Sequence, residues 1–274
     1  MEIPGGGLET HRPSDQRCCV LGSRCLLDNA PYFSRGLRAS IERYRQHPHL
    51  RPVIDILDTR QQASINNWLD PHESKTLFIG RYERTREISC WTTDVFLELM
   101  GIFGRVYNTI GAKNANTILL VHLCDHNKEV LQVETMMHNL LVQLRKYDEH
   151  VFINHKRCEE WDQLRCGISG DADIPERLWG VLEQCIVDSG MRHLVIMLDN
   201  VDVLFESKDR DVFSGFLKHL WAFVHRTSIV VKLLITNRSP HVGAYMEQLR
   251  LSADVALEHI KLEHSPKIRE PQRW

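Results

Sequence analysis

The stretch His193-Leu-Val-Ile-Met-Leu-Asp199-Asn-Val-Asp202 predicts a buried strand that ends in two carboxylates. Its apolar run from Leu194 to Leu198 shows no alternation, which is typical of a parallel strand covered by helices on both faces. Ligands of open α/β sheets bind outside the carboxyl ends of the strands. The stretch therefore indicates both a fold class and the edge of the sheet where chemistry is expected.

On either side of this stretch, short apolar segments alternate with longer amphipathic ones, which indicates βαβ units and a parallel sheet. The predicted strands are Thr76–Ile79, Thr117–Cys124, Leu194–Leu198, Ile229–Ile235 and Val255–Leu262, the last of which would also suit a helix. The predicted helices are Trp91–Tyr107, Glu129–Tyr147, Pro175–Ser189, Asp211–His225 and His241–Leu249, each with apolar residues three or four apart. We predict an α/β fold, a three-layer parallel sheet of about five strands.

The chain divides into four parts on this pattern. Residues 1–30 include a Gly/Pro-rich polar start and are expected to be disordered. Residues 31–70 are predicted to form a short helical lead-in that ends at Asp70-Pro71, because the residue before proline is disfavoured in helices. The α/β domain is expected over residues 71–263, and residues 264–274 are expected to form a frayed tail.

Composition excludes some classes of partner and setting. The net charge of -2 gives no bulk attraction to nucleic acid, so no nucleic-acid partner is expected. The eight cysteines lack the regular spacing of a disulfide scaffold, which favours a reducing, cytoplasmic setting. The apolar runs fall well short of the ~20 residues of a membrane-spanning helix, so no span is predicted.

Polar residues follow the predicted strands where a phosphate site would lie. They are Gly80, Cys124-Asp125, Asp199 to Asp202, and Thr236-Asn-Arg238. Asp199 is suited to hold Mg²⁺, and Asp202 to orient or deprotonate an attacking water. Arg238 is suited to sense a γ-phosphate through charge-assisted hydrogen bonds.

The succession of Asp199-Asn-Val-Asp202 and Lys232-Leu-Leu-Ile-Thr-Asn-Arg238 resembles the Walker B and sensor-1 segments of STAND-type P-loop ATPases, the NACHT and NB-ARC relatives. Asn67-Trp-Leu69 and the stretch from Ile118 through Leu144 are similar to NACHT-like regions of large fungal multidomain proteins. The resemblance covers roughly residues 60–250 and implies a P-loop NTPase-like fold that binds ATP or GTP with Mg²⁺.

The expected phosphate-binding loop departs from the pattern G-x-x-x-x-G-K-[ST]. The corresponding stretch is Gly80-Arg-Tyr-Glu-Arg-Thr85-Arg86-Glu87. Gly80 remains, whereas Thr85 replaces the second glycine, Arg86 the lysine, and Glu87 the hydroxyl that ligates Mg²⁺. A side chain at 85 obstructs close backbone approach, and an anion at 87 repels phosphate. Nucleotide binding is therefore expected to be weak or absent, and hydrolysis weaker still.

Each of these residues also has a purely structural interpretation. Asp199 and Asp202 would suit Asx turns after the strand, and Arg238 would suit a solvated loop charge or a salt bridge. The arginines around Arg86 would suit a solvated turn. His122 and Cys124, with His126, alternate at a strand end, but packing is favoured over zinc because paired ligand spacing is lacking.

The resemblance implies a STAND/NACHT-like nucleotide-binding switch module of a signalling or self-recognition protein, impaired by the loss of the loop lysine and hydroxyl. If active, it would be an NTPase, with protein partners that include further copies of itself. The alternative is a catalytically inert scaffold of P-loop fold that binds other proteins and no cofactor.

Overall fold

The computed structural model describes residues 59–81, 93, 95–101, 117–124, 132–147, 159–162, 164, 174–206, 210–237, 239–253 and 257–262. The predicted disordered segment 1–30, the lead-in before residue 59 and the tail 264–274 lie outside the described residues. No described helix is both long enough and apolar enough to cross a membrane.

The strands form a sheet in which all the neighbouring pairs are parallel, in the order β2-β3-β4-β1-β5. The strands are β1 (Lys75–Arg81), β2 (Thr117–Leu123), β3 (His193–Asp199), β4 (Val230–Asn237) and β5 (Leu257–Leu262). The predicted parallel α/β architecture is confirmed. Continuous apolar runs were the right signal, because β2, β3 and β4 are buried along almost their whole length.

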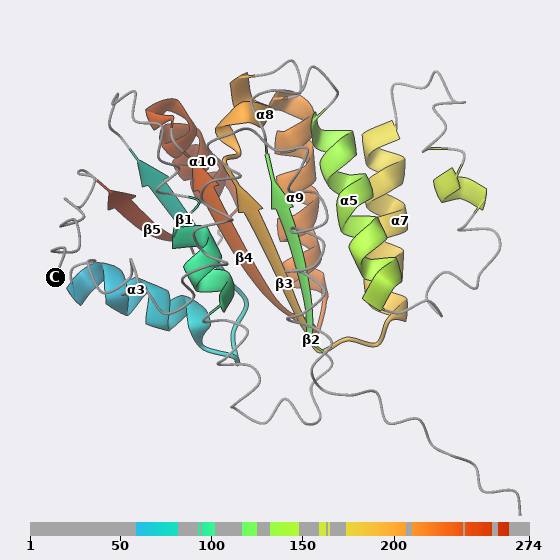
Figure 1. Ribbon diagram of the computed structural model, residues 1–274, viewed down its shortest axis with the longest axis horizontal. Coiled ribbons are helices and arrows are strands. Elements are labelled where there is room, and N and C mark those ends of the chain that lie inside the picture. Colours follow the sequence, from blue (N-terminus) through green and yellow to red (C-terminus); the bar gives the residue numbers. More distant parts are fainter. Residues whose placement is uncertain are drawn as a thin grey trace, which may run out of the picture.

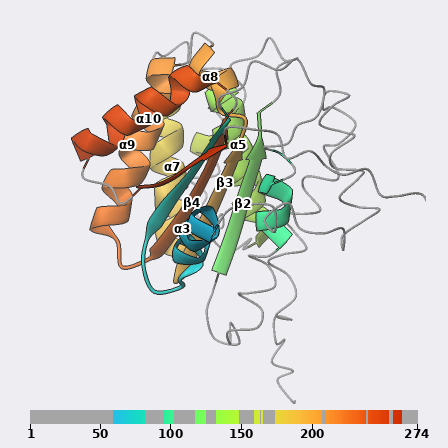
Figure 2. The same cartoon turned by 90° about the vertical axis from the view of Figure 1, so that its left-hand side faces the viewer.

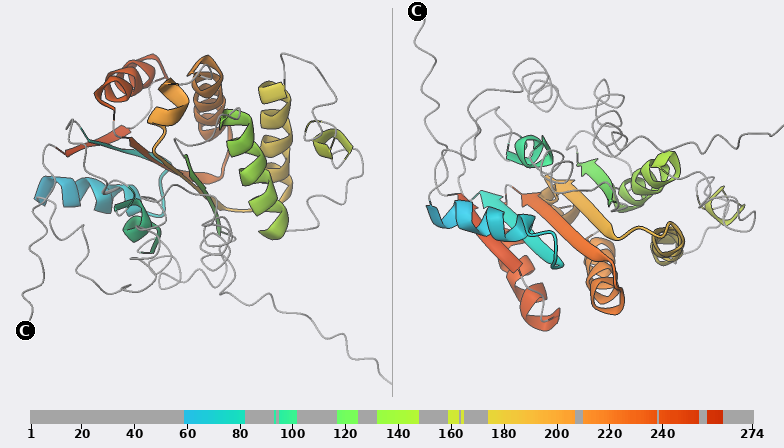
Figure 3. Two further views of the ribbon diagram at one scale, coloured as in Figure 1. Left: turned by 45° about the horizontal axis from the view of Figure 1, so that its top comes forward. Right: turned by 90° about the horizontal axis from the view of Figure 1, so that it is seen from below.

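Helices cover both faces of the sheet (Figures 1 and 2). They are α3 (Thr59–Leu69), α5 (Gln132–Tyr147), α7 (Ile174–Asp188), α8 (Asp202–Glu206), α9 (Arg210–Arg226) and α10 (Pro240–Ala253). The apolar residues of α5, α7, α9 and α10 form one core with one face of the sheet. Those of α3 and of the helical residues 95–101 form a second core on the opposite face. In Figure 3, α3 lies across the sheet from α9 and α10.

The connections that follow β1 and β4 lead to opposite edges of the sheet, so a topological switch point lies between these two strands. The connection after β1 leads to β2 at one edge, whereas the connection after β4 leads to β5 at the other edge. Gly80 and Asn237 are register partners at the carboxyl ends of these two strands. Open α/β sheets bind ligands at such a switch point. The topology therefore selects this end of the sheet as the place for a site.

The helix α3 is joined to the sheet by a buried tryptophan. Trp68 is fully buried, and its indole Nε1 donates a hydrogen bond to the carbonyl oxygen of Leu233 at 3.2 Å. The predicted end of this helix is confirmed, because α3 stops at Leu69 and the backbone of His72 donates to Asp70 Oδ1. The predicted lead-in thus contributes a helix to the core of the α/β domain.

The edge strand β2 is capped by a side chain from α5. The Gln143 amide accepts a hydrogen bond from Val121 N at 2.8 Å and donates one to Val121 O at 2.6 Å. In the described sheet β2 has a strand neighbour on one side alone, which is β3, so these two backbone groups pair with a side chain rather than with another strand. An unpaired edge is a template for association with another strand. Gln143 therefore closes part of this edge in place of a neighbouring strand.

A lysine lies inside the sheet near the amino ends of the strands. Lys232 is fully buried and is the register partner of Lys75, and its Nζ has no hydrogen-bond partner in the part of the chain that the structure describes. Burial, helped by the positive charge of Lys75 and opposed by Asp70 and Glu73, lowers the pKa of Lys232 to about 8. The charged form is thus less stable here than in water.

Replacing Lys232 with methionine is expected to increase the free energy of unfolding at pH 7 by about 1–2 kcal/mol. This is less than the free energy that corresponds to the full pKa shift, because solvent and the nearby carboxylates screen the charge. Since the folded pKa lies below the unfolded one, the stability of the parent protein should rise as the pH increases from about 8 to 10.5. Chemical denaturation at pH 7, 8.5 and 10 checks both effects. A parent protein whose stability falls over this range would contradict the assignment.

Candidate functional site

The site is organised around the carboxylate of Asp199, at the carboxyl end of β3. Its side chain is fully buried. Asp199 Oδ1 accepts a hydrogen bond from the hydroxyl of Thr236 at the end of β4. Asp199 Oδ2 accepts bonds from Thr93 Oγ1 at 2.6 Å and from Asn200 Nδ2 at 2.9 Å. One carboxylate therefore joins β3 and β4 to the start of the helical segment that follows β1.

The backbone turns sharply immediately after Asp199. Asn200 has φ of 56°, in the left-handed region that asparagine tolerates better than most residues. Its backbone N donates to Thr236 Oγ1 at 3.1 Å, and the backbone N of Val201 donates to Thr236 O at 3.0 Å. These bonds fix the turn against the tip of β4 and bring Asp202 to the start of α8. Asp202 is buried, with 3% of its surface exposed.

The contact from Thr93 was missed by the sequence analysis, which looked for a hydroxyl at position 87. Thr93 lies 106 residues before Asp199 and is fully buried. It precedes the apolar residues Val95 to Leu97, and a hydroxyl just before an apolar run is a usual helix-start signal. That signal was available in the sequence. A hydroxyl is therefore present beside the acidic strand tip.

Asn237 at the end of β4 belongs to the predicted strand-tip residues, but its sequence position alone indicated no role for it. Its side chain is 1% exposed, and among the described residues neither its Nδ2 nor its Oδ1 has a hydrogen-bond partner. Leaving a buried donor or acceptor unsatisfied costs about 1–3 kcal/mol. Because Asn237 is the register partner of Gly80, this unsatisfied amide lies at the switch point between β1 and β4.

Of the remaining predicted site residues, one lies in the described part of the chain and three lie outside it. Gly80 is buried in β1, one residue before the strand ends. Thr85, Arg86 and Arg238 lie outside the described residues, so their predicted roles in nucleotide binding remain predictions. The described strand tips thus bring together Gly80 with the tips of β3 and β4.

A thiol also lies at this end of the sheet. Burial raises the pKa of Cys124 well above its usual value, and the charges of Asp199 and Asp202 raise it further. A thiol held in its protonated form is a poor nucleophile and a poor metal ligand. Among the described residues, no group of three or more His, Cys, Asp or Glu side chains is placed to share a metal ion. Cys124 packs in the core that includes residues of α5, α7 and α9.

No protein-family model matches the sequence, and no curated protein matches it. Solved structures with a similar fold include Drosophila ORC bound to AT-rich DNA and Cdc6, at 13% identity and a TM-score of 0.36, over 82% of this chain and 56% of that one. The two structures are similar in the arrangement of their helices and strands. A second is the Aeropyrum pernix ORC2 protein in its ADPNP-ADP complexes, at 12% identity and a TM-score of 0.45, over 76% of this chain and 48% of that one.

A third similar structure is Drosophila ORC bound to GC-rich DNA and Cdc6, at 10% identity and a TM-score of 0.37, over 98% of this chain and 66% of that one. The chain therefore spans less than two thirds of the length of each of these chains. At these identities and TM-scores, the similarity concerns the arrangement of helices and strands and assigns no activity.

Proposed function

We propose that this chain carries a nucleotide-binding switch module of the STAND type, which binds ATP or GTP with Mg²⁺ weakly at the carboxyl ends of β1, β3 and β4. The observation that carries the proposal is the buried, unpartnered amide of Asn237 beside Gly80 at the switch point of the sheet. Phosphate oxygens accept hydrogen bonds and would relieve the unsatisfied donor. Such a ligand belongs at this edge of the sheet.

The residues around Asp199 offer a partial fit for Mg²⁺. A carboxylate has about four lone-pair sites, and three are used by Thr93, Asn200 and Thr236. A metal ion or a metal-bound water would share this carboxylate with those donors or displace one of them, and the Thr93 hydroxyl supplies a second hard oxygen nearby. When bound, Mg²⁺ would neutralise phosphate charge. The chain itself supplies a rigid, buried carboxylate to hold it.

The other predicted residues have roles within this proposal. Asp202 orients the attacking water if hydrolysis occurs, and Arg238 contacts the terminal phosphate. Gly80 lets the backbone approach the phosphates, while Thr85 and Arg86, in place of glycine and lysine, reduce affinity. Nucleotide-dependent change in the Thr93–Asp199 contact would alter how the segment after β1 packs on β3. This contact is the proposed switch: its change would alter the surface that protein partners, including further copies of the chain, bind.

The second candidate is an inert scaffold that binds other proteins. It is favoured by a specific observation, because both oxygens of Asp199 are already satisfied by protein donors. A carboxylate in such a network stabilises the tips of β3 and β4 without any ligand. The two candidates differ in whether nucleotide binds at all.

A titration with fluorescent ATP and GTP analogues, with and without Mg²⁺, distinguishes the nucleotide-binding switch from the inert scaffold. We expect saturable binding with a Kd of about 0.1–1 mM, equivalent to roughly -5 to -4 kcal/mol, that depends on Mg²⁺. Thr93→Val, which removes the hydroxyl and keeps the side-chain shape, should weaken binding several-fold, whereas Thr93→Ser should retain it. Absence of saturable binding up to several millimolar by a folded protein would overturn the switch and leave the scaffold.

A further inference from the structure

The outer surface of the layer formed by α7 and α9 has a small hollow that the nucleotide proposal does not use. Its volume is about 90 Å³, several times the roughly 10–15 Å³ that one water molecule needs. The lining residues that matter for its chemistry are Glu176, Trp179, Asp211, Gly215, Phe216 and His219. A hollow of this size accommodates the end of one side chain.

The rim of the hollow is acidic. Glu176 lies in the first turn of α7 and Asp211 in the first turn of α9, and both are exposed. Each helix N-terminus contributes about half a positive charge, so two carboxylates and two helix ends leave a net charge of about -1 at the rim. His219 Nε2 lies 4.0 Å from Glu176 Oε1, too far for a hydrogen bond. The carboxylates therefore outweigh the helix dipoles.

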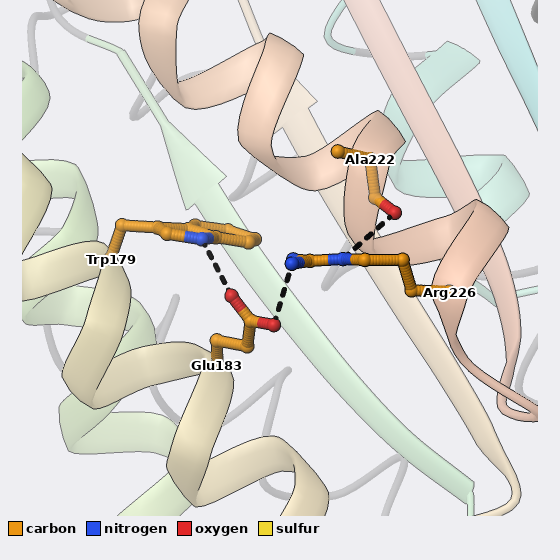
Figure 4. A network of polar contacts seen from close by, with 4 residues as sticks. All are labelled: Trp179, Glu183, Ala222 and Arg226. Carbon is orange, nitrogen blue, oxygen red and sulfur yellow. Dashed lines mark hydrogen bonds and ion pairs between the residues drawn. The ribbon is translucent and has the colours of Figure 1, made fainter.

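The wall of the hollow is aromatic and firmly held. Trp179 packs edge-on against Phe216, with ring centroids 5.5 Å apart, and stacks on His219 at 5.9 Å. Figure 4 shows that its Nε1 donates to Glu183, which also accepts from Arg226 of α9. The two distances are each 2.9 Å. Because the indole is fixed by a bridge between two helices, the hollow is preformed.

The opening of the hollow depends on a glycine. Gly215 lies inside α9, where glycine costs about 1 kcal/mol relative to alanine. A Cβ added at Gly215 would meet no atom within 4 Å, so no packing contact requires the glycine. Gly180 of α7 is also a helical glycine with open space around it, but it does not line the hollow. The two positions therefore provide a matched pair for testing.

We propose that this hollow binds one arginine or lysine side chain of a protein partner. These side chains have an apolar stem and a charged end. The stem matches the wall of Trp179 and Phe216, and the charged end matches the rim of Glu176 and Asp211. A purely apolar side chain would add no positive charge to balance the rim carboxylates, and a phosphate group would be repelled by them. The proposal does not depend on nucleotide binding.

The test uses the full chain and the indole N–H resonance of Trp179, assigned by its loss in Trp179→Phe. N-acetyl-arginine methylamide is titrated to 20 mM, with the uncharged citrulline analogue as the matched probe. We expect a saturable shift of this resonance with the arginine compound and little change with citrulline. Equal shifts with both compounds, or none with arginine, would overturn the proposal.

Two variants test whether the response comes from the hollow. Gly215→Leu should abolish the saturable shift by filling the hollow, while Gly180→Leu, at the matched surface position, should retain it. Both variants are expected to fold, because a Cβ at either position meets no atom within 4 Å and leucine favours helix more than glycine does. Glu176→Gln combined with Asp211→Asn should weaken binding at least fivefold. A response that survives Gly215→Leu, or that is unchanged in the double variant, would contradict the proposed site.

Discussion

Replacing Asp199 with alanine is expected to lower the free energy of unfolding by about 3–5 kcal/mol. The change leaves the donors of Thr93, Asn200 and Thr236 buried without their acceptor. It also separates the helical segment after β1 from the tips of β3 and β4. Chemical denaturation followed by circular dichroism measures the effect.

Asp199→Asn is the control that separates the hydrogen bonds from the side-chain volume. Its single carbonyl oxygen keeps part of the network, so we expect a loss smaller than that of alanine. A loss below about 1 kcal/mol for Asp199→Ala would show that the network contributes little, contrary to its burial. Because the alanine variant is destabilised, it is a poor probe of ligand binding, and Thr93→Val is better suited to that purpose.

Replacing Gln143 with leucine is expected to cost about 2–4 kcal/mol and to promote self-association. Leucine keeps the apolar contacts of α5 but removes both hydrogen bonds to the backbone of Val121. The Val121 N–H and C=O are then buried without partners, or exposed on an open strand edge. Denaturation and size-exclusion chromatography at several protein concentrations measure the two effects.

Val142→Ala is the matched control for this prediction. Val142 is the neighbouring residue on α5 and is 37% exposed, so its truncation should change stability by less than about 0.5 kcal/mol. Gln143→Glu should be as harmful as leucine, because a carboxylate cannot donate to Val121 O. A Gln143→Leu variant with the same apparent size and the same stability as its parent would refute the role of this residue as an edge cap.

The fold was predictable because local pattern and tertiary burial agree. The apolar run Leu194–Leu198 became β3, buried on both faces, and the amphipathic segments became α5, α7, α9 and α10. The spacing of apolar residues along the chain indicates both the type of element and the side that is buried, so a single sequence reveals them. The short helix α8 was not predicted, because five residues carry too little periodicity.

The site was only half predictable, because its contacts join distant residues. The acidic strand tip at Asp199 followed from the position of an apolar run, but its bond to Thr93 spans 106 residues. The same holds for Gln143 and Val121, since an amide within an apolar helix stripe does not show which backbone it meets. Lys232 interrupts an apolar strand, and the sequence did not show that its ammonium would be buried.

The most direct test of a phosphate site at the β1–β4 switch point is the free energy of unfolding with and without 10 mM Mg-ATP, for the parent protein and for Asn237→Leu. With a Kd of about 1 mM, the nucleotide should stabilise the parent by about 1.4 kcal/mol. Asn237→Leu should be at least as stable as its parent without nucleotide, because it removes two unsatisfied buried atoms, and should gain nothing from Mg-ATP. A parent protein that gains nothing, or a leucine variant that gains as much, would contradict the site.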